Sequence, residues 1–268
     1  MSRLSLFLNR SSKLLRDNSS KILRMQGADE PSRAPKLLFE FNAKEAVEQF
    51  ATGCDADIGG TSSVHFELNE TPTKPEGLAA LAGANYSPRP TAKFWGEMRL
   101  GVRPELREQI RGGYAGFRSK ARYMFCFHGV NADYVSLHEY LALRMRAGGS
   151  PRTRNSYYVN IQTDGPVTTD LWQHRLFFHR DDGEWEDVFV PFNRFVLTNS
   201  GEIQPEQLEM FRERVRTVGI SLLGGNNGIE GPYELEIDSI RAVNEEDVTA
   251  PVPNNEVTDG TQWQRHAV

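Results

Sequence analysis

Hydrophobic and polar side chains alternate with a period of two through the middle of the chain. The clearest stretch is 231–240, in which apolar residues occupy every second position from Tyr233 to Ile237 and acids fill the positions between them. This is the pattern of a half-buried β-strand. The same reasoning predicts strands at 36–42, 63–68, 93–100, 114–118, 121–127, 141–146, 157–162, 171–179, 185–192 and 218–222. About eleven short strands separated by Gly- and Pro-bearing turns predict an all-β sandwich or barrel.

Helical signals are few. Asn42 is placed to cap a short helix at 43–50, with Glu45 three residues later as in a capping box. Two further short helices are expected at 103–111 and 205–214. None of these segments alternates regularly with strands, which argues against βαβ units and a parallel sheet. Prolines within 70–91 predict a long surface loop between two strands.

The two ends of the chain differ from its body. Residues 1–24 are rich in Arg, Lys and Ser, and a helical wheel separates an apolar side from a basic one. This pattern predicts a mitochondrial transit-like leader, the alternative being a basic tail. We expect a linker at 25–35, the sandwich domain at 36–243 and a disordered tail at 244–268. No stretch approaches the roughly twenty apolar residues of a membrane-spanning helix, so any membrane association is expected to be peripheral.

Charge and cysteine content narrow the classes of partner. The sequence holds 36 Asp and Glu against 31 Lys and Arg, and the leader takes a disproportionate share of the bases, so the body is acidic. Nucleic-acid affinity comes mainly from Lys and Arg that neutralise phosphates, so no nucleic-acid partner is expected. Cys54 and Cys126 are too few for a disulfide framework or a zinc site, and both are expected to be reduced and buried.

Motifs that would carry catalysis are not found. The sequence contains no G-x-S-x-G elbow, and its six histidines lack metal-ligand spacing. The glycine clusters at 112–116 and 224–228 are interpreted as turns or bulges. Glu234, Glu236 and Asp238 share one strand face, but acids two apart on a solvated face usually only increase solubility. We therefore predict a protein that is not an enzyme and that has no cofactor or metal.

A polar sheet face is the candidate binding site. If Val159, Leu176 and the other apolar residues at every second position of 141–146, 157–162 and 171–179 enter the core, Arg, Tyr and amide side chains emerge on the reverse side. Arg binds carboxylates and aromatic faces, Tyr gives rigid contact area, and amides both donate and accept hydrogen bonds. An ordinary solvated sheet face is the alternative. The predicted partner-binding residues are Arg144, Arg146, Tyr158, Asn160, Gln173 and Arg175.

Seven segments between Lys36 and about Val243 together carry a family resemblance. They are Asp57-Ile-Gly-Gly-Thr-Ser, Phe94-Trp-Gly-Glu, Gly112-Gly-Tyr-Ala-Gly-Phe-Arg118, Leu141-Ala-Leu-Arg-Met-Arg146, Tyr157-Tyr-Val-Asn-Ile161, Trp185 through Pro191-Phe192, and Gly231-Pro-Tyr-Glu-Leu-Glu-Ile-Asp238. In this order they resemble the complex I intermediate-associated protein family, the thirty-kilodalton type of assembly factor for mitochondrial NADH:ubiquinone oxidoreductase. The resemblance implies a galactose-binding-domain-like jelly-roll β-sandwich with a few short helices.

The resemblance also implies a function. It implies a chaperone in the mitochondrial matrix or at the matrix face of the inner membrane, which binds a membrane-arm assembly intermediate of complex I. Implied partners include other assembly factors, such as an acyl-CoA dehydrogenase homologue in animals or a larger helical-repeat protein in fungi. The family supplies no catalytic residues.

A carbohydrate-binding module of the same fold is the alternative function, with a structural calcium ion held by oxygen ligands such as Asp238. Where relatives often have Gly-Asp-Gly after the Arg-x-Arg strand, this chain has Ala147-Gly-Gly-Ser-Pro-Arg152. The missing acid argues against a sugar or metal site there and favours the assembly factor.

Overall fold

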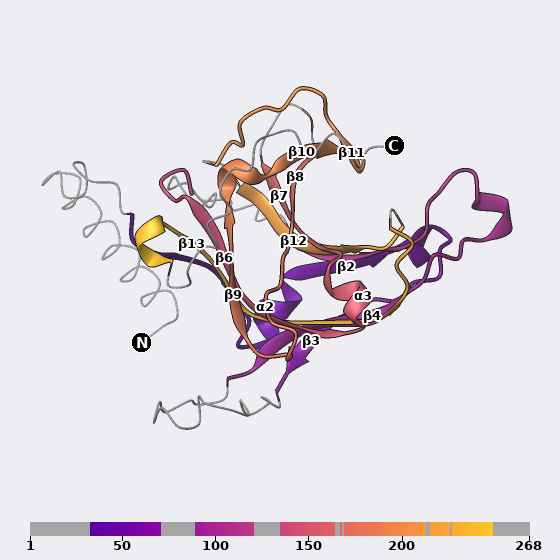
Figure 1. Ribbon diagram of the computed structural model, residues 1–268, viewed down its shortest axis with the longest axis horizontal. Helices are drawn as coiled ribbons and strands as arrows, with labels where there is room; N and C mark the ends of the chain where they lie inside the picture. Colours follow the sequence, from indigo (N-terminus) through magenta and orange to yellow (C-terminus); the bar gives the residue numbers. More distant parts are fainter. Residues whose placement is uncertain are drawn as a thin grey trace, which may run out of the picture. The chain divides into compact units, whose positions relative to one another are not determined.

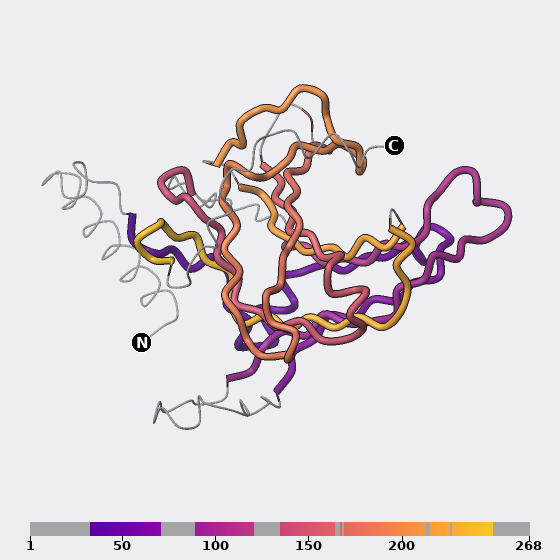
Figure 2. Tube along the Cα trace, in the orientation of Figure 1, coloured from indigo at the N-terminus to yellow at the C-terminus, as the bar shows by residue number. Residues whose placement is uncertain are grey.

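The computed structural model describes residues 33–70, 89–120, 135–163, 167, 169–212, 215–225 and 227–248. Within the unit Pro35–Val268, two antiparallel sheets pack against each other around one hydrophobic core (Figure 1). Figure 2 shows the two layers as separate runs of the chain trace. The predicted all-β sandwich is confirmed.

The first sheet, called sheet A, has six strands in the order β3-β4-β13-β6-β9, and β1 also pairs with β13. The long strand β13 lies at its centre and pairs with β4 on one side and with β6 on the other. The strands are β1 (Lys36–Glu40), β3 (His65–Asn69), β4 (Thr91–Met98), β6 (Tyr140–Gly149), β9 (Glu186–Pro191) and β13 (Gly231–Val243).

The second sheet, called sheet B, has seven strands in the order β11-β10-β8-β7-β12-β5-β2. The strands are β2 (Phe50–Cys54), β5 (Tyr114–Ser119), β7 (Tyr157–Thr163), β8 (Asp170–Arg175), β10 (Val196–Asn199), β11 (Glu202–Ile203) and β12 (Val215–Leu223). Short helices lie between the strands, namely α2 (Lys44–Glu48), η1 (Asp55–Ile58), η3 (Pro104–Leu106), α3 (Pro151–Arg154) and η4 (Phe192–Arg194), and η5 (Glu245–Asp247) follows the last strand.

The core lies between the inner faces of the two sheets. Phe94 of sheet A and Phe117 of sheet B meet across it, with ring centroids 5.0 Å apart. Along β7 the odd-numbered residues are buried and the even-numbered ones are partly exposed, as the alternation predicts. Each large apolar side chain that is fully buried contributes about 1.5–3 kcal/mol, so this inward-facing half of every strand stabilises the sandwich.

The predicted helices are the weakest part of the sequence-based expectation. Helix α2 begins after Ala43, which provides no side-chain cap, so the prediction that Asn42 caps it is wrong. The helix stops at Glu48 because Phe50 enters the core as the first residue of β2, with its ring 5.1 Å from that of Phe41. Only a 3₁₀ turn forms within 103–111, at Pro104–Leu106.

The segment 205–212 is not helical. The side chain of Gln207 accepts a hydrogen bond from the Leu197 backbone N–H at 2.7 Å and donates one to the Leu197 carbonyl at 3.1 Å. The loop is therefore attached to β10 by a side chain that satisfies backbone groups of that strand. Strand β2 and the short strands β10 and β11 were not predicted.

Several predicted features lie outside the residues that the structure describes, and one cysteine differs from its predicted burial. The predicted strand 121–127, the leader 1–24 and most of the loop 70–91 lie outside the described residues, as does Cys126. Cys54 is a free cysteine that is only half-buried, so the prediction that it is buried is wrong in degree. Among the described residues, no helix is long and apolar enough to cross a bilayer.

Candidate functional site

The structure divides the six predicted binding residues between two faces. Tyr158 and Asn160 on β7, with Gln173 and Arg175 on β8, emerge on the outer face of sheet B, and the register pairs Tyr158 with Arg175 and Asn160 with Gln173. Arg144 and Arg146 lie on β6, which belongs to sheet A. The expectation of one shared face is therefore wrong for the two β6 arginines, because alternation fixes the side of a strand but not the sheet that the strand joins.

The β6 arginines are held by ion pairs on the outer face of sheet A. Arg144 Nη1 lies 2.9 Å from Asp187 Oδ2, and Arg146 Nη2 lies 2.6 Å from Glu236 Oε1. Glu236 is only 3% exposed. The Arg146 guanidinium also lies 5.4 Å from the centre of the Trp185 ring. These cations are bound within the protein itself and are poorly available to a partner.

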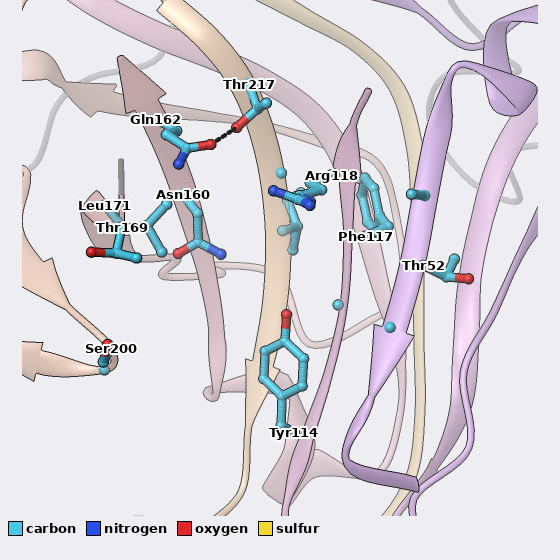
Figure 3. A pocket seen from close by; sticks show the side chains of 16 residues that line it. Thr52, Tyr114, Phe117, Arg118, Asn160, Gln162, Thr169, Leu171, Ser200 and Thr217 are labelled. Atoms are coloured by element: carbon cyan, nitrogen blue, oxygen red, sulfur yellow. Dashed lines mark hydrogen bonds between the residues drawn. The ribbon is translucent and has the colours of Figure 1, made fainter. Parts of the chain in front are cut away.

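The outer face of sheet B contains a hollow of about 610 Å³ (Figure 3). Sites for small ligands or short segments typically have this size. Strands β2, β5, β7, β8 and β12 contribute to it, together with the β10–β11 turn. Its lining residues are Ala51, Thr52, Gly53, Tyr114, Gly116, Phe117, Arg118, Asn160, Gln162, Thr169, Leu171, Ser200, Gly201, Thr217, Gly219 and Ile220. We call it the sheet B hollow.

Glycines form the floor of the sheet B hollow. Gly53 is opposite Gly116 in the pairing of β2 with β5, and Gly219 of β12 lies between Arg118 and Asn160 in the register. A Cβ at Gly219 would lie 2.4 Å from the Phe117 carbonyl oxygen. The close approach of β5 therefore requires glycine there, and it leaves backbone rather than side chains at the base of the hollow.

Hydrogen bonds hold the amides at one side of the hollow. Asn160 Nδ2 donates to Ser221 Oγ at 2.9 Å, and Gln173 Nε2 donates to Asn160 Oδ1 at the same distance. Gln162 Oε1 accepts a hydrogen bond from Thr217 Oγ1 at 3.4 Å, as drawn in Figure 3. The polar wall is therefore fixed in orientation by its own network before any ligand binds.

Tyr114 and Arg118 form the other side of the hollow, and the prediction from sequence missed both. They alternate with buried Ala115 and Phe117 along β5, so their side chains project outward. Burial raises the pKa of Tyr114, and the neighbouring charge of Arg118 opposes this shift. The strand predicted at 114–118 contained part of the signal, because its alternation puts Tyr114, Gly116 and Arg118 on the same outward side.

A buried carboxylate anchors the start of β5 and thus places Tyr114. Asp55 is 1% exposed and accepts hydrogen bonds from the Ser62 N–H at 2.8 Å and from Ser62 Oγ at 2.9 Å. It also accepts from the backbone N–H groups of Gly113 and Tyr114. Any side chain at Gly60 would collide with the Asp55 carboxyl group. The segment 55–62 therefore has a structural role at one end of the hollow.

The calcium-binding alternative finds no assembled site among the described residues. No group of three or more His, Cys, Asp or Glu side chains among them is placed to hold a metal ion. Asp238, named above as a calcium ligand, lies 3.5 Å from Arg89 Nη2 in an ion pair.

The two antiparallel sheets and the recessed polar face define a β-sandwich of the jelly-roll class. The structure resembles the family 11 carbohydrate-binding module of a cellulosomal cellulase from Clostridium thermocellum, with a TM-score of 0.50 and 10% identity over 80% of this chain and 96% of the module. At this identity the likeness concerns the fold alone.

Sequence comparison identifies the family. The model of the family described as Complex I intermediate-associated protein 30 matches residues 39–237, and the chain belongs to this family. The predicted resemblance is confirmed.

Two relatives carry the name "Complex I intermediate-associated protein 30, mitochondrial". The Neurospora crassa protein is 34% identical over 80% of this chain and 75% of its own length. The Drosophila melanogaster protein is 27% identical over 76% of this chain, but the match spans only 61% of that relative.

Proposed function

We propose that this chain is a non-catalytic assembly factor that binds an assembly intermediate of mitochondrial respiratory complex I. The observation that carries the proposal is the family match over 39–237, which spans nearly the whole sandwich. A protein that binds only a partly built complex lowers the free energy of that intermediate by mass action and needs no catalytic residue. The proposed partners are a membrane-arm intermediate and other assembly factors.

The outer face of sheet B is the proposed contact surface. The hollow and the amide network lie on this face, and the paired residues Tyr158 and Arg175 project from the same face on β7 and β8. Arg175 donates from Nε to the Asn155 carbonyl at 2.6 Å, and its guanidinium lies 5.6 Å from the Phe177 ring, which is 53% exposed. An oriented arginine beside an exposed aromatic ring is a combination that often dominates the energetics of protein interfaces.

The location follows from the same proposal. The leader 1–24 would direct the chain to the matrix or to the matrix face of the inner membrane, where the sandwich 36–243 would act. Import of the labelled chain into isolated mitochondria tests this. Cleavage within the leader and protection from added protease are expected, and a chain that stays uncleaved and protease-sensitive would contradict the location.

Native gel electrophoresis of mitochondria that express the tagged chain tests the function. The chain is expected to comigrate with an intermediate that contains complex I subunits and to be absent from the finished complex. Arg175→Glu is expected to release it, while Arg107→Glu serves as the matched control, because Arg107 is an exposed residue on the remote 103–111 loop. Wild-type protein that migrates only as a free monomer would refute the assembly role.

A further inference from the structure

Two hydrogen-bond donors in the sheet B hollow have no partner in the described part of the chain. There, neither the Arg118 guanidinium nor the Tyr114 hydroxyl forms a hydrogen bond or an ion pair. Both side chains project from β5 into the hollow, and Figure 3 shows the Tyr114 hydroxyl directed along the strand towards Arg118. Tyr114 is 44% exposed and Arg118 is exposed, so a ligand can reach both.

Among the described residues, no acidic side chain lines this hollow, and Arg118 is the one charged residue in the described lining. A guanidinium offers paired N–H donors in a planar fork that matches the two oxygens of a carboxylate. The phenol can donate a third hydrogen bond to the same group. The other lining side chains are neutral, and Asn160, Gln162 and Thr217 already bond within the wall.

The floor determines what shape can enter. Gly53, Gly116 and Gly219 add no side chains of their own to the floor, and the Tyr114 hydroxyl lies over Gly116, so the main chain of a ligand can approach the sheet closely beside the phenol. An extended peptide segment has a narrow main chain and projects side chains to alternate sides. One such side chain would therefore reach the two donors while its own backbone passes over the glycines.

We infer that the sheet B hollow binds an Asp or Glu side chain from an extended segment of the partner protein, with its carboxylate held by Arg118 and Tyr114. The inference rests on the proposed function, because it takes the partner to be a protein, and it names the chemistry by which that partner is recognised. A phosphate-rich ligand fits less well, since a single cation in a chain of net charge −5 gives little compensation for a doubly charged group.

Solution NMR of the purified chain tests the site without the partner. The probe is the peptide acetyl-Gly-Gly-Glu-Gly-Gly-amide, and its comparison probe has Gln in place of Glu. Saturable shifts of the Arg118 side-chain N–H and of the Gly116 and Gly219 amides are expected with the Glu peptide. The Gln peptide is expected to bind about tenfold or more weakly, because it lacks the charge-assisted hydrogen bonds.

Variants assign the effect to the two donors. Arg118→Met is expected to weaken the Glu peptide by about tenfold or more, and Tyr114→Phe by roughly two- to tenfold. Arg107→Met is the matched control and should leave the affinity unchanged. Equal binding of the Gln peptide, or Glu-peptide binding that survives Arg118→Met, would overturn the inference. The same would follow if inorganic phosphate or the neutral sugar cellotetraose bound at these amides more tightly than the Glu peptide.

A mitochondrial experiment separates this inference from the assembly role. A photo-crosslinker at Ala51, which lines the hollow and lies opposite Arg118 in the pairing of β2 with β5, is expected to attach to a partner peptide that contains Asp or Glu near the attachment site. Reversing that acid to Arg should then restore the comigration that Arg118→Glu abolishes. If wild-type and Arg118→Glu chains comigrate equally with the intermediate, the carboxylate site is wrong and the assembly role stands. If neither chain comigrates while the purified chain binds the Glu peptide, the assembly role is wrong and the carboxylate site stands.

Discussion

The outer faces of the two sheets arise from the same alternation of residues, yet they use polar side chains in opposite ways. On sheet A, charged residues bond one another: Asp187 accepts from both Arg144 and Arg241, and Lys93 lies 3.0 Å from Glu234. On sheet B, neutral amides and hydroxyls form the network, and Arg118 stays open to the solvent. A self-paired face contributes to the fold, whereas a face with an unpaired donor can recognise a ligand.

The largest expected loss of stability follows removal of Glu236, the buried acid that pairs with Arg146 on sheet A. Glu236→Ala leaves the Arg146 guanidinium without its buried partner, and also removes the acceptor of a 3.3 Å hydrogen bond from Thr91. We expect the free energy of unfolding to fall by about 3 kcal/mol, measured by urea denaturation. Glu234→Ala, on the same strand but with a more exposed pair, is the control and should cost about 0.5 kcal/mol or less. Similar losses for both would show that sheet A is not held by the buried pair.

The stability of sheet B should depend more on its glycines than on its charged side chains. Gly219→Ala forces a Cβ to within 2.4 Å of a backbone oxygen, so we expect a loss of about 2 kcal/mol in thermal or urea unfolding. Gly53→Ala is the matched control on the same floor, where the added Cβ meets only Asp57 Oδ2 at an ordinary 3.7 Å. A Gly219→Ala protein as stable as the Gly53→Ala protein would contradict the proposed close approach of β5 and β12.

Part of the loss of stability at acidic pH should also arise in sheet B. His174 on β8 has its pKa lowered by burial, with the Arg194 charge acting in the same direction and a backbone hydrogen bond at Arg175 opposing it. The unfolded chain therefore binds the proton first, and the free energy of unfolding falls as pH drops from about 6.5 to the lower pKa of the folded state. Urea denaturation at pH 7.5 and 5.5 measures this loss. His174→Gln should flatten the difference, and an unchanged difference would assign the dependence to other groups.

The smallest expected effect on stability belongs to the proposed binding residue. Arg118→Met should change the free energy of unfolding by no more than about 0.5 kcal/mol, because the guanidinium has no partner to lose in the described structure. Arg146→Met, by contrast, removes the cation that pairs with the buried Glu236 carboxylate and should lower the free energy of unfolding several times more. If the two arginine variants were equally destabilised, the distinction between a self-paired and an open face would fail.

The strands show what could be predicted from sequence. The alternation placed Val159 and Leu176 inside and Tyr158 and Arg175 outside, and the structure confirms it, because burial of apolar side chains is a property of each strand alone. Which sheet a strand joins depends on partners far away in the sequence. For this reason the β6 arginines were placed on the wrong face, although their outward orientation was right.

The hollow shows what could not be predicted. Gly219 lies about a hundred residues from Arg118, and only the pairing of β12 with β5 places them side by side. Phe50 was assigned to a helix because local signals favoured one, and its burial against other aromatic rings decided otherwise. A concave site built from several strands is defined by long-range register, which periodicity within one strand does not contain.

The Asp55 carboxylate ties the segment up to Ser62 to the first residues of β5. The Asp57–Ser62 stretch, one of the segments that carry the family resemblance, therefore closes one end of the sandwich and is not among the described residues that line the hollow. Two relatives could keep this closure unchanged while attaching to different clients. Grouping the family by the residues at positions 114, 118, 160 and 219 would then separate its members by the partner that they bind, even where the segment that closes the sandwich is the same.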